Sequence, residues 1–267
     1  MVGRGARGES EGTALPQLEG KVVMVTGAAR GLGRRYCEAL AGEGAAVVGV
    51  DISDCADTVA SVTETGGRAL GVTVDVTDLD SCRAGVAAAV TEFGRLDGLV
   101  NNAALYATLT SGPFDAIPER EWDAAMSVNV TGIWNMCRVA VPAMREAGGG
   151  SIVNISSLAA VYGLPNALHY TTSKAAVLGL TRGLARELGR NWIRVNAVAP
   201  SAVETEGTRE FFGEGKDRAL DVIAKQQSLR RTLDPSDVAG TIVYLVSDAS
   251  KFVTGQTLMV DGGTVST

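Results

Sequence analysis

A tyrosine and a lysine at helical spacing carry the clearest chemical signal in this sequence. Tyr170 and Lys174 stand four positions apart in HYTTSK, so they share one face if the segment is helical. A free phenol ionises at about pH 10, but a neighbouring ammonium favours the phenolate and lowers its pKa. We therefore expect Tyr170 to exchange a proton with an alcohol or carbonyl oxygen. The bare pattern also occurs as a surface pair on helices, so its meaning depends on the motifs around it.

Two polar residues in apolar surroundings point to the same chemistry. Ser157 ends the apolar run GSIVNISS, and parallel sheets place functional groups at the carboxyl ends of their strands. We expect Ser157 to hydrogen-bond the substrate oxygen beside Tyr170. Ser156 is the rival, although a two-residue strand period puts the two serines on opposite faces. Asn129 lies in the apolar helical stretch MSVNVTG, where a polar residue usually bends the helix or binds water.

The composition argues against metal chemistry and against charged macromolecular partners. One histidine and four scattered cysteines cannot form a zinc set, so we expect no metal site and a carbonyl polarised by hydrogen-bond donors. His169 is next to Tyr170 and faces another side of the helix, which predicts a packing or surface residue. The formal net charge is −6 and no basic stripe is present, which argues against nucleic acid and anionic membranes.

The chain carries no recognisable targeting segment. No apolar run approaches the roughly 20 residues of a membrane span, and the N-terminus lacks the apolar region of a secretion signal. Residues 1–17 are interpreted as a disordered leader, and residues 18–267 as one domain. Cys37 and Cys137 lie in apolar periodic stretches and are expected to be buried free thiols. Reduced cysteines predict a cytoplasmic protein.

Seven short apolar runs alternate with segments of helical period. Short continuous Val/Ile/Leu runs indicate strands buried on both faces, and their alternation with helices indicates βαβ units. The sequence therefore predicts an α/β fold, a single-domain Rossmann-like doubly wound sheet of seven mainly parallel strands flanked by helices. Residues 204–231 form the least regular stretch and are interpreted as a mobile helical substrate flap. The expected strands are 21–27, 45–51, 70–76, 96–103, 150–157, 192–200 and 256–263.

A glycine-rich turn after the first strand predicts a dinucleotide site. The segment TGAARGLG, residues 26–33, lets the backbone approach a pyrophosphate at a helix N-terminus, although an isolated match also occurs in ordinary turns. Asp51 ends the second strand, where a carboxylate binds both ribose hydroxyls and repels a 2′-phosphate, which selects NAD over NADP. Arg30 argues the other way, because a guanidinium pairs with phosphate. We give Asp51 more weight, since Ile52 and Ser53 add no cation.

Together these motifs resemble the short-chain dehydrogenase/reductase family. The resemblance extends from Gly20 to Gly263. It rests on the segments TGAARGLG, VDVTD, NNAA, MSVNVTG, HYTTSK, APSAVET and TGQTLMVDGG. Two departures are Ala104 and Ser201, which stand where the family usually has glycine. The first should be tolerated, and the second is expected to reshape the turn under the nicotinamide.

The resemblance implies a role for each matching residue. Asn129, Ser157, Tyr170 and Lys174 would form a catalytic tetrad. Asn129 would position a water linking Lys174 to a proton path, and Lys174 would also hold the nicotinamide ribose. Asn101 would stabilise the sheet beside the cofactor. The cofactor-binding residues expected from the motifs and the resemblance are Gly27, Arg30, Gly31, Leu32, Gly33, Asp51, Ile52, Asp75, Val76, Asn102, Ala103, Ala104, Tyr170, Lys174, Pro200, Val203 and Thr205.

The expected function is hydride transfer between NAD(H) and a secondary alcohol or ketone. Apolar residues near the site favour a hydrophobic substrate, although Phe211 and Phe212 fit simple packing equally well. A 3-oxoacyl-thioester reductase is an alternative that usually takes NADPH and a basic docking surface, and Asp51 argues against it. A non-catalytic NAD-binding regulator is a second alternative, opposed by the intact tetrad. The family resemblance also implies a homotetramer. The residues expected to line the substrate pocket are Leu105, Tyr106, Leu158, Val161, Tyr162, Leu164, Phe211 and Phe212.

Overall fold

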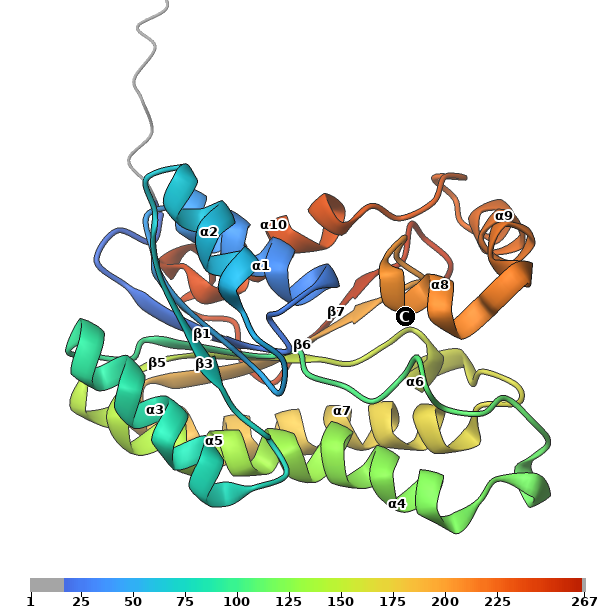
Figure 1. Ribbon diagram of the computed structural model, residues 1–267, viewed down its shortest axis with the longest axis horizontal. Helices are drawn as coiled ribbons and strands as arrows, with labels where there is room; N and C mark the ends of the chain where they lie inside the picture. Colours follow the sequence, from blue (N-terminus) through green and yellow to red (C-terminus); the bar gives the residue numbers. More distant parts are fainter. Residues whose placement is uncertain (1–16, 266–267) are drawn as a thin grey trace, which may run out of the picture.

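A seven-stranded sheet forms the centre of the molecule (Figure 1). The structure is a computed structural model and describes residues 17–265. The strand order is β3-β2-β1-β4-β5-β6-β7, and every pairing is parallel. The predicted doubly wound Rossmann-like sheet is therefore confirmed. The strands are β1 (Val22–Thr26), β2 (Ala46–Asp51), β3 (Arg68–Thr73), β4 (Gly98–Asn101), β5 (Gly150–Ile155), β6 (Ile193–Pro200) and β7 (Thr257–Val260).

Helices cover both faces of the sheet (Figure 1). One face carries α1 (Gly31–Gly42), α2 (Ala56–Glu64) and α10 (Pro235–Val246). The opposite face carries α3 (Leu79–Phe93), α4 (Glu119–Met126), α5 (Gly132–Glu146) and α7 (Leu168–Leu188). No described helix is long and apolar enough to cross a membrane. The predicted leader lies outside the described residues, apart from Gln17 at its end.

The two-residue period of the strands divides the core into two layers. In β1, Val22 and Met24 pack on the side of α3, α5 and α7, whereas Val23 and Val25 pack on the side of α1 and α10. All five residues of this strand are buried, because helices remove both faces of a parallel sheet from water. Cys37 and Cys137 are buried free thiols, as predicted, one in each layer.

The chain reverses direction across the sheet between β1 and β4. β1 pairs with β2 on one side and with β4 on the other. The strands from β1 to β3 therefore follow one another toward one edge of the sheet, and those from β4 to β7 toward the other edge. Open α/β sheets bind ligands in the crevice at the carboxyl ends of the strands that flank such a switch point. The fold therefore directs attention to the loops after Thr26 and Asn101.

Every strand differs from its predicted range by one or more residues, and the differences at β3 and β4 have local reasons. β4 ends at Asn101 rather than at residue 103, because the backbone N–H groups of Asn102 and Ala103 donate to the Thr26 hydroxyl, each at 2.9 Å. These hydrogen bonds take the place of the backbone hydrogen bonds that a longer β4 would make with its neighbouring strand. β3 occupies residues 68–73 instead of 70–76, and Val74 then turns away while its N–H donates to the Asp51 carbonyl at 2.8 Å.

The stretch predicted as a flap contains two helices. They are α8 (Glu206–Phe212) and α9 (Lys216–Gln226), which lie together at one end of the molecule near the C-terminus (Figure 1). A parallel bridge between Val203 and Leu233 closes the stretch at its base. We call residues 206–226 the α8–α9 segment.

Candidate active site

A cavity of about 890 Å³ opens at the carboxyl ends of the strands. It receives residues from the loops after β1, β2, β4, β5 and β6 and from the α8–α9 segment. Of the predicted site residues, Gly33 and Asn129 do not line it. Those that do are Gly27, Arg30, Gly31, Leu32, Asp51, Ile52, Asp75, Val76, Asn102, Ala103, Ala104, Ser157, Tyr170, Lys174, Pro200, Val203 and Thr205.

The glycine-rich turn is built by close backbone packing. A Cβ on Gly27, where φ is +66°, would lie 2.8 Å from the Cα of Ala103. A Cβ on Gly33 would lie 2.0 Å from the carbonyl oxygen of Gly27. Gly33 therefore lets α1 pack onto the turn, which explains why it lies behind the cavity lining.

The N-terminus of α1 is suited to an anion. Its N-cap residue, Arg30, makes no side-chain cap bond, and the first turn carries no acidic residue. Gly31 has φ +59° and no atom within 4 Å of an added Cβ, so its backbone faces open space in the cavity lining. Free N–H groups and the helix dipole at such a position favour a phosphate. The turn thus fits the pyrophosphate of a dinucleotide.

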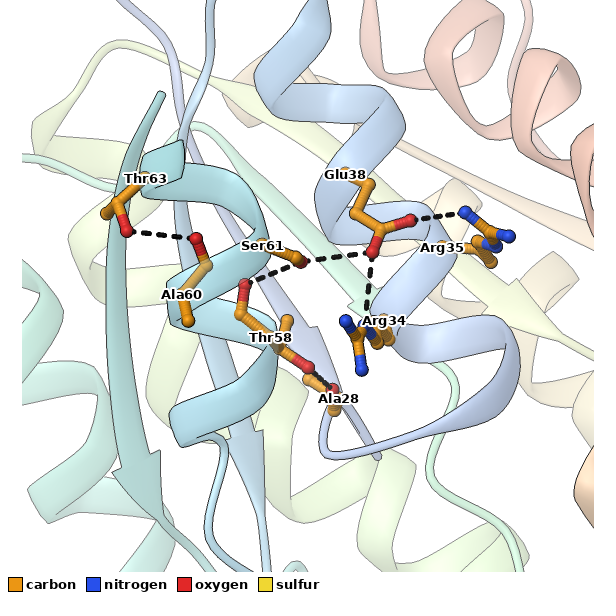
Figure 2. Close-up of polar contacts among 8 residues, drawn as sticks. All are labelled: Ala28, Arg34, Arg35, Glu38, Thr58, Ala60, Ser61 and Thr63. Carbon is orange, nitrogen blue, oxygen red and sulfur yellow. Dashed lines mark hydrogen bonds and ion pairs between the residues drawn. The ribbon is translucent and has the colours of Figure 1, made fainter. Parts of the chain in front are cut away.

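Polar contacts attach α2 to α1 and to the turn (Figure 2). The Thr58 hydroxyl donates to the carbonyl of Ala28 at 2.7 Å. On α1, Glu38 accepts from Ser61 of α2 at 3.0 Å and from Arg34 at 3.1 Å. Burial raises the pKa of its carboxyl group, but the hydrogen bonds from Arg35, Arg34 and Ser61 outweigh it and lower that pKa. The network fixes the turn relative to the segment that follows β2.

Asp51 is held rigidly at the end of β2. One carboxylate oxygen accepts the backbone N–H of Ala29 at 3.0 Å, and the other accepts that of Ser53 at 3.0 Å. Both bonds orient the carboxylate while it lines the cavity. Ile52 beside it has 71% of its surface exposed, so an apolar side chain open to solvent forms part of the cavity lining.

Tyr170, Ser157 and Lys174 meet on the cavity floor. The Ser157 hydroxyl lies close enough to the Tyr170 hydroxyl to lower the pKa of the phenol. The Lys174 Nζ atom lies 5.8 Å from the centroid of the Tyr170 ring and donates to the Ile155 carbonyl at 2.8 Å. The Ser156 hydroxyl instead donates to the carbonyl of Lys174 at 2.8 Å. The hydroxyl of Ser157, rather than that of Ser156, therefore contacts the phenol.

Burial dominates the ionisation of the phenol and the amine. It raises the pKa of Tyr170 to about 12, against the opposing effect of the Ser157 hydrogen bond. Burial also lowers the pKa of Lys174 to about 8. The expected lowering of the Tyr170 pKa by Lys174 is therefore wrong for this structure, in which burial raises that pKa and penalises the charged forms of both groups.

Asn129 links two elements of the site without lining the cavity itself. It lies fully buried in a π-helical turn, Ser127–Thr131, a feature that often marks functional regions. Its Nδ2 donates to the Leu105 carbonyl at 3.1 Å and to the Ser173 hydroxyl at 3.0 Å. The Ser173 hydroxyl donates in turn to the Tyr170 carbonyl at 2.8 Å. Asn129 thus joins the loop after β4 to α7, the position of a residue that orients others.

The single histidine lies outside the cavity lining. His169 is buried, and its Nδ1 accepts the Tyr170 backbone N–H at 2.9 Å. Its Nε2 lies 3.9 Å from a carboxylate oxygen of Glu121. This placement agrees with the predicted packing role.

Aromatic side chains build the wall next to Tyr170. The ring of Tyr106 stacks on Phe211 with centroids 4.4 Å apart and lies 5.0 Å from the ring of Tyr170. Phe212 lines the cavity, whereas Phe211 stands behind Tyr106. The expectation that Val161 lines the pocket is wrong, because its side chain is 40% exposed to solvent and is not part of the cavity lining.

Several lining residues could not be named individually from the sequence, although residues 204–231 are predicted as a substrate flap. They come from the α8–α9 segment and from the chain after β7, and no local pattern distinguishes them. Only tertiary packing brings these elements to the cavity. The residues are Thr208, Ile223, Gln226, Thr264 and Val265.

The buried lysine predicts a pH-dependent contribution to stability. The pKa of Lys174 is about 8 in the folded protein, against an ordinary value of 10.5. Between these values the unfolded chain binds more protons, so stability rises with pH. We expect the free energy of unfolding of the wild type, minus that of Lys174→Met, to increase by roughly 2–3 kcal/mol across this range. Urea unfolding of the ligand-free protein measures it.

Lys251→Met provides the matched control, because Lys251 is exposed at the surface. The difference between its unfolding free energy and that of the wild type should not change over the same range. Parallel stability curves for the wild type and Lys174→Met would contradict the assigned burial effect.

The chain is similar to dehydrogenases and reductases over nearly its whole length. Residues 27–265 match a family model described as enoyl-(acyl carrier protein) reductase. A 3-oxoacyl-(acyl-carrier-protein) reductase from Thermotoga maritima is 39% identical over 251 residues, covering 93% of this chain and 99% of that protein. A 3-alpha-(or 20-beta)-hydroxysteroid dehydrogenase from Mycobacterium bovis is 41% identical over 250 residues, covering 94% of this chain and 91% of that protein.

A solved structure of a protein similar in sequence has the same fold. Carveol dehydrogenase from Mycobacterium avium, in complex with NAD, superposes with a TM-score of 0.87 at 33% identity, covering 93% of this chain and 99% of that chain. These similarities extend through the glycine-rich turn, the strand ends and the Tyr170–Lys174 helix described above. The chain therefore belongs to the short-chain dehydrogenase/reductase family, whose members use a nicotinamide cofactor and act on CH–OH groups.

Proposed function

We propose that the protein transfers a hydride between NAD(H) and a hydrophobic secondary alcohol or ketone. The observation that carries this proposal is that Tyr170, Ser157 and the buried Lys174 all line one cavity, with the Lys174 Nζ atom 5.8 Å from the centroid of the Tyr170 ring. When bound, the nicotinamide ring supplies the hydride donor or acceptor. The protein supplies the orientation of the substrate oxygen and the proton.

Each of the three residues has a distinct proposed role. Tyr170 takes a proton from the alcohol during oxidation and returns it to the carbonyl oxygen during reduction. Ser157 donates a hydrogen bond to the same oxygen. Lys174 favours the phenolate when its ammonium is charged and binds the nicotinamide ribose. Asn129 acts as a positioning residue through its bonds to Leu105 and Ser173.

Charge in the cavity lining supports a neutral substrate. Within the described part of the chain, the charged lining residues are Arg30, Asp51, Asp75 and Lys174, all proposed to face the cofactor. The lining beyond Ala104 and around Tyr162 is apolar or neutral. Burying a carboxylate or phosphate there would be costly without a cation. The names of two relatives, a hydroxysteroid dehydrogenase and a carveol dehydrogenase, agree with an apolar alcohol.

A 3-oxoacyl-thioester reductase is the second candidate function. It is favoured by the name of the relative from Thermotoga maritima. Asp51 argues against it, because this activity usually takes NADPH and the carboxylate would repel a 2′-phosphate. Turnover on an aryl ketone, compared with turnover on an acetoacetyl thioester, separates the two functions.

We infer that the protein assembles as a homotetramer and that it is cytoplasmic. Trp134 on α5 and Leu168 at the start of α7 are half exposed, and both helices lie on the same face of the sheet (Figure 1). Apolar helix faces of this kind suit isologous contacts. Free buried cysteines suit a reducing compartment. Sedimentation equilibrium at micromolar concentration should give four times the chain mass, and a one-chain mass contradicts the assembly.

Removing the phenol hydroxyl should abolish turnover while leaving the fold intact. Tyr170→Phe keeps the ring against Tyr106 but removes the proton donor, a contribution typically on the order of 10²–10⁴-fold. Steady-state rates measure the loss, and NADH fluorescence titration measures binding separately. Tyr244→Phe is the control, because that phenol lies on α10 outside the cavity lining. Near-normal turnover of Tyr170→Phe would overturn the mechanism.

The Asp51 carboxylate should make NAD(H) the preferred cofactor. It is fixed by two backbone N–H groups and would accept ribose hydroxyls while repelling a 2′-phosphate. We expect Asp51→Ala to weaken NADH binding roughly tenfold, equivalent to about 1.4 kcal/mol. Asp54→Ala, just outside the cavity lining, is the matched control. Equal kcat/KM for NADP(H) and NAD(H) in the wild type contradicts the prediction.

A further inference from the structure

The arginine of the glycine-rich turn is already engaged by the α8–α9 segment. Arg30 Nη1 donates to Glu210 Oε1 at 2.5 Å, and Nη2 donates to Oε2 at 3.1 Å. This two-point geometry is the strongest arrangement for a guanidinium and a carboxylate. Glu206, one helical turn earlier on α8, has an oxygen 4.0 Å from the same Nη1. Two carboxylates of α8 therefore surround one guanidinium.

The charges around Arg30 are unfavourable for an additional phosphate. Glu210, Glu206 and Asp51 all raise the pKa of Arg30, as nearby carboxylates do. One cation thus stands among three carboxylates at this edge of the cavity. The other lysine or arginine in the cavity lining is Lys174, which donates to the Ile155 carbonyl on the cavity floor. Among the residues 17–265 that the structure describes, Arg30 is the cation of the cavity lining that a 2′-phosphate beside Asp51 could pair with.

We propose that Glu210, assisted by Glu206, is a residue that determines cofactor specificity. It holds the Arg30 guanidinium away from a 2′-phosphate and so adds to the discrimination by Asp51. This inference rests on the proposed use of the cavity for a dinucleotide. The specificity of the glycine-rich turn is then set partly by a helix 180 positions later in the chain.

The same ion pair connects cofactor choice to the substrate wall. α8 also carries Thr208 and Phe212, which line the cavity. A 2′-phosphate that captured Arg30 would release α8 from the turn and loosen this wall. Turnover with NADP(H) should therefore show a raised KM for the alcohol or ketone, in addition to weaker cofactor binding.

The ion pair can be removed without unfolding the protein. The side chains of Arg30 and Glu210 are 58% and 45% exposed, and exposed pairs contribute little to stability. Glu210→Gln keeps the shape of the side chain and removes its charge. Glu204→Gln is the matched control, since Glu204 makes its ion pair with Lys216 and lies outside the cavity lining.

The test is a fluorescence titration of NADH and NADPH with purified protein. We expect Glu210→Gln to tighten NADPH binding roughly fivefold, the scale of an exposed ion pair, and to change NADH binding less than about twofold. Glu204→Gln should change neither. Adding Arg30→Ala to Glu210→Gln should remove the gain, because the freed guanidinium causes it. In steady state, the KM for the ketone with NADH should rise in Glu210→Gln toward the value with NADPH, because the ion pair no longer holds α8 to the turn.

Two results would overturn the proposal. One is an unchanged ratio of NADPH to NADH affinity in Glu210→Gln. The other is the same gain when Arg30 is absent, which would show simple repulsion by Glu210 rather than capture of the arginine. Failure of the proposed function looks different, because a wild type that binds neither reduced cofactor contradicts the dinucleotide site itself.

Discussion

The attachment of α7 to the end of β5 determines where every reacting group lies. The Lys174 ammonium donates to the carbonyl of Ile155, and the Ser156 hydroxyl donates to the carbonyl of Lys174. Further along, Asn154 Nδ2 donates to the Thr181 hydroxyl at 2.9 Å. All three bonds are buried, where an unpaired polar group is costly. The helix therefore has one register against the strand, and that register brings the Tyr170 phenol to Ser157.

This attachment also explains how a buried amine is tolerated. Lys174 is almost completely inaccessible, and taking its ammonium out of water is unfavourable. The single carbonyl partner only partly compensates, so the amine is less basic than in water. The site thus contains a phenol that resists ionisation and an amine that resists protonation. A positively charged ligand would lower the pKa of Tyr170 and favour its phenolate, whereas a polar oxygen bound next to Lys174 would raise the pKa of that amine.

Residues within one strand–turn–helix unit could be predicted from the sequence. The turn at Gly27 and the carboxylate of Asp51 follow directly from strands whose ends meet at one edge of a parallel sheet. The pairing of Tyr170 with Lys174 follows from helical periodicity alone. The strand ranges erred where side chains of another strand took over backbone groups, as the Thr26 hydroxyl does after β4.

Long-range contacts and desolvation could not be predicted. Gln226 and Val265 line the cavity where the chain after α9 meets the chain after β7, with the Leu229 N–H donating to the Gly262 carbonyl at 3.0 Å, and no local pattern encodes that meeting. The partners of Asn129 are likewise distant in sequence. The high pKa of Tyr170 depends on how completely the neighbours exclude water, a property of the packed molecule.

The bridge between Val203 and Leu233 has a consequence for how such an enzyme can diversify. It joins the two ends of the stretch that contains the α8–α9 segment, so the chain between Val203 and Leu233 forms a closed loop. The entropy cost of closing a loop grows slowly with its length. Insertions and deletions between the two bridge residues should therefore cost little, and they leave β6 and α10 where they are. Substrate range can evolve in this one interval while the proton-transfer groups keep their positions.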